Sequence, residues 1–145
     1  EGAKLSSMTG RDVIWRITFQ EFYNNSLFGY GPKLWGQEYS ARYNLLGVAS
    51  NAHNQIVDLL GASGLFGAAA FLLYLGALFK YSLAVTKTVG RIPLVLLIAM
   101  CIRAIPEVPF RLENVLSNDF SLHMILIGIL FTALRQQESE KIHTI

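Results

Sequence analysis

Residues 59–79 read LLGASGLFGAAAFLLYLGALF and carry no charged side chain. An uncharged apolar run of this length fits one crossing of a bilayer by a helix. Gly61, Gly64 and Gly67 recur every three residues within it. Small residues at such positions allow a neighbouring helix to approach closely. This stretch therefore predicts an integral membrane protein.

The composition of the whole chain favours the same class. The chain has 145 residues, of which 52% are hydrophobic and 15% charged, whereas soluble domains carry about 25% charged residues. The net charge of +2 gives no indication of a nucleic-acid partner. Cys101 is the single cysteine and lies in an apolar stretch, so it predicts a buried hydrophobic residue and no disulfide within the chain.

Two shorter apolar runs follow the first one. Residues 92–105 have Pro93 at their second position, which suits a first helical turn, and are stopped by Pro106. Residues 120–134 are short for a crossing but can borrow 116–119 at their start. We expect an all-α fold whose transmembrane region, 56–135, holds three helices, at about 56–80, 91–106 and 117–135.

The basic residues predict the orientation of these helices. Lys80, Lys87 and Arg91 lie in one short loop, and Arg135 and Lys141 lie near the C-terminus. The loop at 106–119 holds one arginine and three acidic residues. The positive-inside rule places the 80–91 loop and the tail, 136–145, in the cytoplasm. It leaves 1–55 and 106–119 on the opposite, periplasmic or extracellular side.

The N-terminal region, 1–55, contains no membrane-length run. Residues 9–12, Thr-Gly-Arg-Asp, read as a capped helix start, and the apolar spacing after them predicts an amphipathic helix that ends near residues 24–25. Residues 28–32, Phe-Gly-Tyr-Gly-Pro, form a turn-prone cluster. We expect residues 33–50 to be loop with short helical pieces.

His53 is the first candidate for chemistry in this region. It lies in Asn51-Ala52-His53-Asn54, just before the first predicted crossing. A neutral imidazole accepts a proton near pH 7, so His53 could act as a general base at the membrane surface. The alternative is an interfacial histidine bonded to backbone.

Two arginines are candidates for binding an anion. Arg11 lies in the first turn of the predicted helix, where free backbone N–H groups and a guanidinium both favour phosphate oxygens. A solvated arginine, or an ion pair with Asp12 or Glu21, is the alternative. Arg103 lies near one end of the second predicted crossing, where charged residues face a cavity or a partner. A structural pair with Glu107 and a substrate contact are both open for it, and snorkelling is a third possibility.

Common catalytic motifs are missing from the sequence. It has no phosphate-binding glycine loop, no Gly-x-Ser-x-Gly elbow and no CxxC pair. The three histidines, His53, His123 and His143, are too scattered to suggest a metal site. We interpret His123 as a core histidine and assign no role to His143.

Three segments together resemble the O-antigen ligase/polymerase family of bacterial inner-membrane enzymes. Residues 9–15, TGRDVIW, are similar to the family's helix start. Residues 25–32, NSLFGYGP, are similar to its turn, with Ser26 where the family often has proline. Residues 52–55, AHNQ, lead directly into a glycine-rich helix, as its histidine motif does.

The resemblance implies metal-independent, inverting glycosyl transfer from an undecaprenyl-diphosphate-linked glycan, with no cofactor. His53 would be the base, Arg11 would bind the donor diphosphate, and Asn54 would orient His53 or the acceptor. Gly29 and Gly31 would shape the loop that brings Arg11 and His53 together. With Arg103 added, these residues are the predicted site.

The resemblance also implies a larger protein around this chain. We expect the C-terminal part of a polytopic inner-membrane enzyme, with the remaining transmembrane helices of the parent protein and membrane lipid as partners. The acceptor, whether glycan, lipid or protein, stays open. The alternative function is a non-enzymatic transporter or transport-associated subunit, in which Arg103 and Glu107 would matter more than His53.

Overall fold

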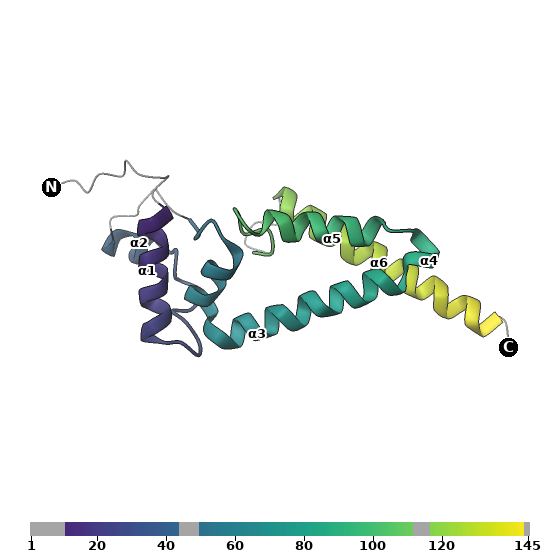
Figure 1. Ribbon diagram of the computed structural model, residues 1–145, viewed down its shortest axis with the longest axis horizontal. Coiled ribbons are helices and arrows are strands. Elements are labelled where there is room, and N and C mark those ends of the chain that lie inside the picture. The colour runs from purple at the N-terminus through teal and green to yellow at the C-terminus, as the bar shows by residue number, and fades with distance from the viewer. Residues whose placement is uncertain (1–10, 44–49, 112–116, 144–145) are drawn as a thin grey trace. The chain divides into compact units, whose positions relative to one another are not determined.

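The computed structural model describes residues 11–43, 50–111 and 117–143, and all regular structure in these ranges is helical. Figure 1 labels the helices in chain order as α1 (Arg11–Asn24), α2 (Gln37–Arg42), α3 (Gln55–Ala84), α4 (Thr86–Val89), α5 (Ile92–Arg103) and α6 (Asn118–His143). The prediction of an all-α fold is therefore confirmed over the described part of the chain. The chain divides into two compact units. The first combines residues 1–71 with 104–108, and the second combines 72–103 with 109–145.

Helix α1 is the predicted amphipathic helix and ends where the sequence indicates. Its buried residues recur at helical spacing and face the rest of the first unit; they are Ile14, Ile17, Thr18 and Glu21. Arg16 and Gln20 are exposed on the remaining face, as the pattern predicts. Thr9, the predicted cap, lies outside the described residues.

The core of the first unit is small and rich in aromatic rings. Ile17, Leu34 and Tyr39 form its buried centre, where Leu34 and Tyr39 are each only 1% exposed. Tyr39, on α2, meets the ring of Tyr30 edge-on at 4.7 Å between centroids. Helix α2 thus supplies the short helical piece that was expected between 33 and 50.

Helix α3 is interrupted near its start. Gly64 adopts φ 60° and ψ −156°, which no α-helix contains, so the helix consists of a short part before Gly64 and a long part after it. Figure 1 shows a bend in the ribbon near the start of α3. The sequence predicted one continuous helix from about residue 56, and this break is a correction to that prediction.

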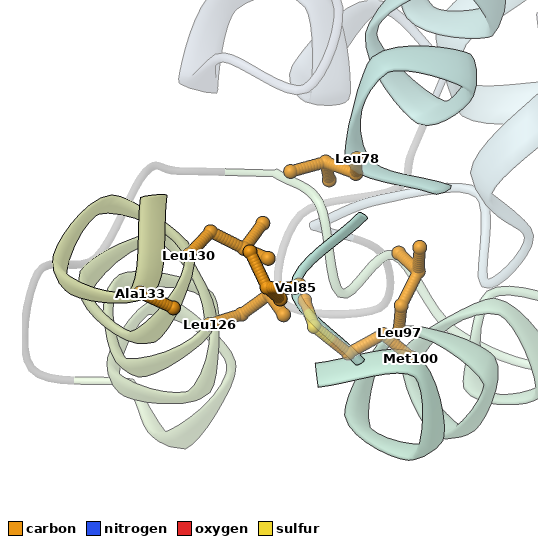
Figure 2. Packing of buried hydrophobic residues seen from close by; sticks show 7 residues of the cluster. All are labelled: Leu78, Val85, Leu97, Met100, Leu126, Leu130 and Ala133. Atoms are coloured by element: carbon orange, nitrogen blue, oxygen red, sulfur yellow. The ribbon is translucent and has the colours of Figure 1, made fainter. Parts of the chain in front are cut away.

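The second unit is held together by apolar side chains. Leu78, Val85, Leu97, Met100, Leu126, Leu130 and Ala133 form one buried cluster contributed by the end of α3, α5, α6 and the residue before α4. Figure 2 shows these side chains converging between the helices. Gln137 on α6 adds a polar contact, since its amide nitrogen donates to the Ala84 carbonyl at the end of α3, at 3.1 Å.

One helix of the described residues, α3, is long and apolar enough to cross a membrane. Only 22% of its most apolar stretch is buried, which suits a lipid-facing helix better than the core of a soluble domain. Helix α5 is apolar but has 12 residues, about 18 Å of helix. Helix α6 has 26 residues and does not meet the same apolarity. Three crossings, and their orientation, therefore stay a prediction.

Candidate active site

The backbone just before α3 is fixed by two buried side chains. Asp58 is 4% exposed, and its Oδ1 accepts from the Ala52 N–H at 2.9 Å and from the Trp35 indole N–H at 2.7 Å. Trp15 on α1 donates its indole N–H to the Ala52 carbonyl at 2.8 Å. Both polar backbone groups of Ala52 are thus held, and Ala52 itself is fully buried. This arrangement sets the position of His53, the next residue.

His53 has an unusual backbone conformation. Its φ is 50°, the only positive value at a non-glycine residue in the described part of the chain. Histidine tolerates this region better than most residues, but the conformation still costs free energy and recurs at functional sites. The Asn51 side-chain oxygen accepts from the His53 N–H at 2.8 Å and stabilises the turn.

The imidazole of His53 faces a carboxylate from a distant part of the sequence. Its Nδ1 lies 3.5 Å from Oε2 of Glu107. The atom Nδ1 is shielded from solvent and the contact does not meet hydrogen-bond geometry, so it is an ion pair only when the imidazole is protonated. The side chain is 32% exposed, and its exposed part lies away from Nδ1. Pairing of Glu107 with His53 differs from the predicted alternative of a pair with Arg103.

Hydrogen bonds from Asn54 and Gln55 hold the segment that carries Glu107 next to His53. The Asn54 side-chain oxygen accepts from the N–H groups of Ile56 and Val57, each at 3.0 Å, and so caps α3. Its amide nitrogen donates to the Ile105 carbonyl at 2.9 Å. The Gln55 N–H donates to the carbonyl of residue 104 at 3.0 Å. Asn54 therefore has a structural role that the sequence did not indicate, and its predicted contact with His53 or the acceptor stays a prediction.

Arg11 is the first residue of α1 and lies one helical turn before Trp15, on the same face. It is half-buried and forms no ion pair with any residue that the structure describes. The alternative partner Glu21 is buried and instead accepts from the Tyr43 hydroxyl at 2.9 Å, which raises the pKa of Tyr43. A guanidinium and a helix N-terminus are both groups that favour an anion.

Gly29 and Gly31 fasten the predicted turn to α3. Both have positive φ, 69° and 103°. The N–H groups of Tyr30 and Gly31 donate to the carbonyls of Gly61 and Ala62, at 2.8 and 2.9 Å. A Cβ on Gly29 would lie 2.6 Å from the Gly61 carbonyl oxygen, so only glycine fits there. The turn is thereby held between α1, which carries Arg11, and the start of α3.

Arg103 belongs to the second unit and is paired there. Its Nη1 lies 3.1 Å from Oδ1 of Asp119, and its side chain is 49% exposed. Its proposed contact with substrate stays a prediction. His123 is buried at 2% exposure, stacks on Tyr74 and bonds to its hydroxyl, as expected of a core histidine.

Some features of the site could not be found from the sequence. Asp58 and Glu107 were not predicted to lie near His53, because the bonds of Asp58 to Trp35 and of Asn54 to Ile105 join residues far apart in the chain. The side chain of His143 lies outside the described residues. Within ranges 11–43, 50–111 and 117–143, no three His, Cys, Asp or Glu side chains are grouped so that they could hold a metal ion.

These observations define a helical protein with one membrane-length helix, a His53–Glu107 contact beside the start of that helix, and Arg11 at the N-terminus of α1. In a comparison with known families, residues 1–72 match the O-antigen ligase family, as expected of a fragment of such an enzyme. The matched range contains Arg11, Gly29, Gly31, His53 and Asn54, whereas Arg103 and Glu107 lie beyond it. No curated protein and no solved structure matches the chain.

The family match confirms the resemblance found in the three motifs. It indicates a role in glycosyl transfer during polysaccharide assembly, with a lipid-linked glycan donor and a glycan acceptor in general terms. It also indicates an association with a membrane, in agreement with α3.

Proposed function

We propose that this chain carries the catalytic base and a donor-binding arginine of a glycosyltransferase. The enzyme moves a glycan from undecaprenyl diphosphate to an acceptor hydroxyl, as a ligase or polymerase of surface polysaccharide in the bacterial inner membrane. The observation that supports this most is the contact between His53, which lies within the O-antigen ligase match at residues 1–72, and Glu107, which lies outside it.

In the proposed step, the acceptor oxygen attacks the anomeric carbon of the donor sugar. The bond from that carbon to the diphosphate breaks, and the proton of the acceptor hydroxyl passes to Nε2 of His53. Glu107 lies beside Nδ1, so its negative charge stabilises the imidazolium that forms and holds the ring in one orientation. Attack from the face opposite the diphosphate inverts the anomeric centre.

Arg11 has a separate role in the proposal. The leaving diphosphate gains negative charge as the bond to the sugar breaks, and fixed positive groups at that place lower the barrier. Arg11 combines a guanidinium with the N-terminus of a 14-residue helix, and both favour phosphate oxygens. Among the described residues, no carboxylate forms an ion pair with Arg11 that would compete with the diphosphate.

A glycan-transfer assay in membranes tests this proposal. The full-length protein is compared with its His53→Ala and Arg11→Ala variants, with a defined undecaprenyl-diphosphate glycan as donor. Loss of a general base is expected to lower the rate by about 10²–10⁴-fold, and loss of Arg11 to lower it by a similar or smaller factor. Arg16→Ala is the matched control for Arg11, because Arg16 lies on the exposed face of the same helix.

Equal amounts of each variant in the membrane fraction separate chemistry from insertion. Transfer by the Arg16→Ala variant at the parent rate, with loss in the other two, supports the proposal. Transfer by His53→Ala at the parent rate contradicts the role of His53 as base. An equal loss in Arg11→Ala and Arg16→Ala contradicts a specific role for Arg11.

A further inference from the structure

The break in α3 separates a short part, 55–63, from a long part, 65–84, and only the long part has the length of a membrane crossing. The whole helix has 30 residues, about 45 Å at 1.5 Å per residue, which exceeds the roughly 30 Å apolar core of a bilayer. Residues 65–84, after the break, make up about the 20 residues that one crossing requires. The break at Gly64 therefore lies where a crossing of the right length would begin.

The turn at residues 26–31 forms backbone hydrogen bonds with both parts of α3, on either side of the break. The Tyr30 and Gly31 N–H groups bond to the carbonyls that end the short part of α3. The Leu65 and Phe66 N–H groups, which begin the long part, donate to the carbonyls of Ser26 and Leu27 at 2.8 and 3.1 Å. A Cβ on Gly64 would lie 2.5 Å from the Leu27 carbonyl carbon, so the close approach depends on glycine.

The outer surface of this junction is apolar. Four side chains, which we call the apolar belt, are exposed at it: Phe28 at 63%, Phe66 at 58%, Leu27 at 52% and Leu65 at 49%. The rings of Phe28 and Phe66 pack at 5.1 Å between centroids and join the turn to the helix. No charged residue occurs from 22 to 32.

Two physical arguments assign lipid to this surface. The belt is continuous with α3, the helix that suits a membrane crossing, because Leu65 and Phe66 belong to both. Irregular backbone near hydrocarbon must have its polar groups satisfied within the protein. The turn meets this condition at the break, and its Gly29 N–H also donates to the Asn25 carbonyl at 2.7 Å.

We propose that the turn at 26–31 and the break at Gly64 mark one boundary of the bilayer crossing, with the apolar belt in contact with lipid acyl chains. The crossing then runs over 65–84 rather than from residue 56. The short part of α3, 55–63, is about 14 Å of helix and separates this boundary from His53 along the chain, so the proposed crossing does not include the candidate site.

Site-directed spin labelling tests the belt directly. Cys101→Ala first removes the only cysteine of the chain. One new cysteine, at position 28 or 65, then carries the spin label. The labelled protein is reconstituted in phosphatidylcholine–phosphatidylglycerol vesicles. Collision with oxygen, which concentrates in lipid, is compared with collision with a water-soluble nickel chelate. Gln20, exposed on the polar face of α1, is the aqueous reference. Leu73, 77% exposed on α3, is the lipid reference.

Labels at 28 and 65 are expected to favour oxygen over nickel, opposite to the label at 20, and to lie at shallower depth than the label at 73. Nickel-dominated collisions at 28 and 65 would place the belt in water and overturn the proposal. Low collision rates with both reagents would show protein cover, by a second copy or another segment, and would also overturn it. If the label at 28 lay as deep in the membrane as the label at 73, the proposed boundary at Gly64 would be wrong, and a crossing that begins near residue 56 would be supported instead.

Discussion

The two units of the chain are stabilised in different ways. In the first unit, a buried carboxylate, two indole N–H groups and the backbone of a turn hold specific neighbours through hydrogen bonds, as at Asp58 and Ala52. In the second unit, apolar side chains such as Leu97 and Leu126, both 0% exposed, pack without fixed polar partners. Precise placement of a reacting group depends on oriented hydrogen bonds, whereas apolar packing tolerates exchange. We therefore expect the first unit to control activity and the second to control stability.

The glycine at the helix break offers the sharpest test of the first unit. Gly64→Ala places a Cβ within 2.5 Å of backbone at φ 60°, and the steric and conformational penalties together cost about 2–5 kcal/mol. We expect loss of folded protein, measured by thermal unfolding in detergent. Gly76→Ala in the same helix meets nothing within 4 Å, and is expected to stabilise by up to about 1 kcal/mol. Equal stability of the two variants would contradict the close contact between Gly64 and the turn at 26–31.

Removal of the Asp58 carboxylate should have the next largest effect. Asp58→Ala leaves the Trp35 indole and the Ala52 N–H without their acceptor, at about 1–3 kcal/mol for each. We expect reduced stability together with reduced transfer, because the backbone before His53 loses its anchor. Asp58→Asn keeps one acceptor oxygen and should lose less. Glu38→Ala, on an exposed side chain of α2, serves as the neutral control.

A substitution that creates a cavity in the second unit should lower the free energy of unfolding and leave the transfer rate unchanged. Leu97→Ala in a soluble core would cost about 2–5 kcal/mol, and we expect less here because lipid replaces water as the surrounding solvent. The transfer rate per folded molecule should stay at the parent value. Leu73→Ala, on an exposed residue, gives the baseline. A rate loss in Leu97→Ala that exceeds the loss of folded protein would remove the distinction between the two units.

The Arg103–Asp119 pair should give the smallest change. The pair is partly exposed, and such pairs contribute at most about 1 kcal/mol, so Arg103→Gln and Asp119→Asn are expected to lower stability slightly and equally. The predicted substrate contact of Arg103 would raise the donor KM about fivefold or less in Arg103→Gln only. Equal KM values in both variants would remove Arg103 from the site.

Local patterns in the sequence predicted local structure well. The end of α1 near residue 24 followed from the spacing of apolar residues, and the helix stop before Pro106 followed from proline geometry. The glycines at 61, 64 and 67 were interpreted as a surface for a neighbouring helix. Gly64 instead admits the turn at 26–31, and glycine spacing alone does not distinguish a close backbone contact from helix packing.

The site could be predicted only in part, for the same physical reason. His53 stood out because its residue type and position suit proton transfer, and Arg11 because it begins a helix. The pairing of His53 with Glu107 joins segments more than fifty residues apart, and it depends on the Asn54–Ile105 and Gln55–residue 104 bonds. Backbone hydrogen bonds of this kind leave no pattern in a single sequence.

The most direct test of the account is a double-mutant cycle on His53 and Glu107 in the glycan-transfer assay. Glu107→Gln is expected to lower kcat about 10–100-fold at unchanged donor KM, with partial recovery in Glu107→Asp. In a His53→Ala background the same substitution should have no further effect, because the carboxylate acts only through the imidazole. An equal fold-loss from Glu107→Gln in both backgrounds would contradict the account, since Glu107 would then act independently of His53.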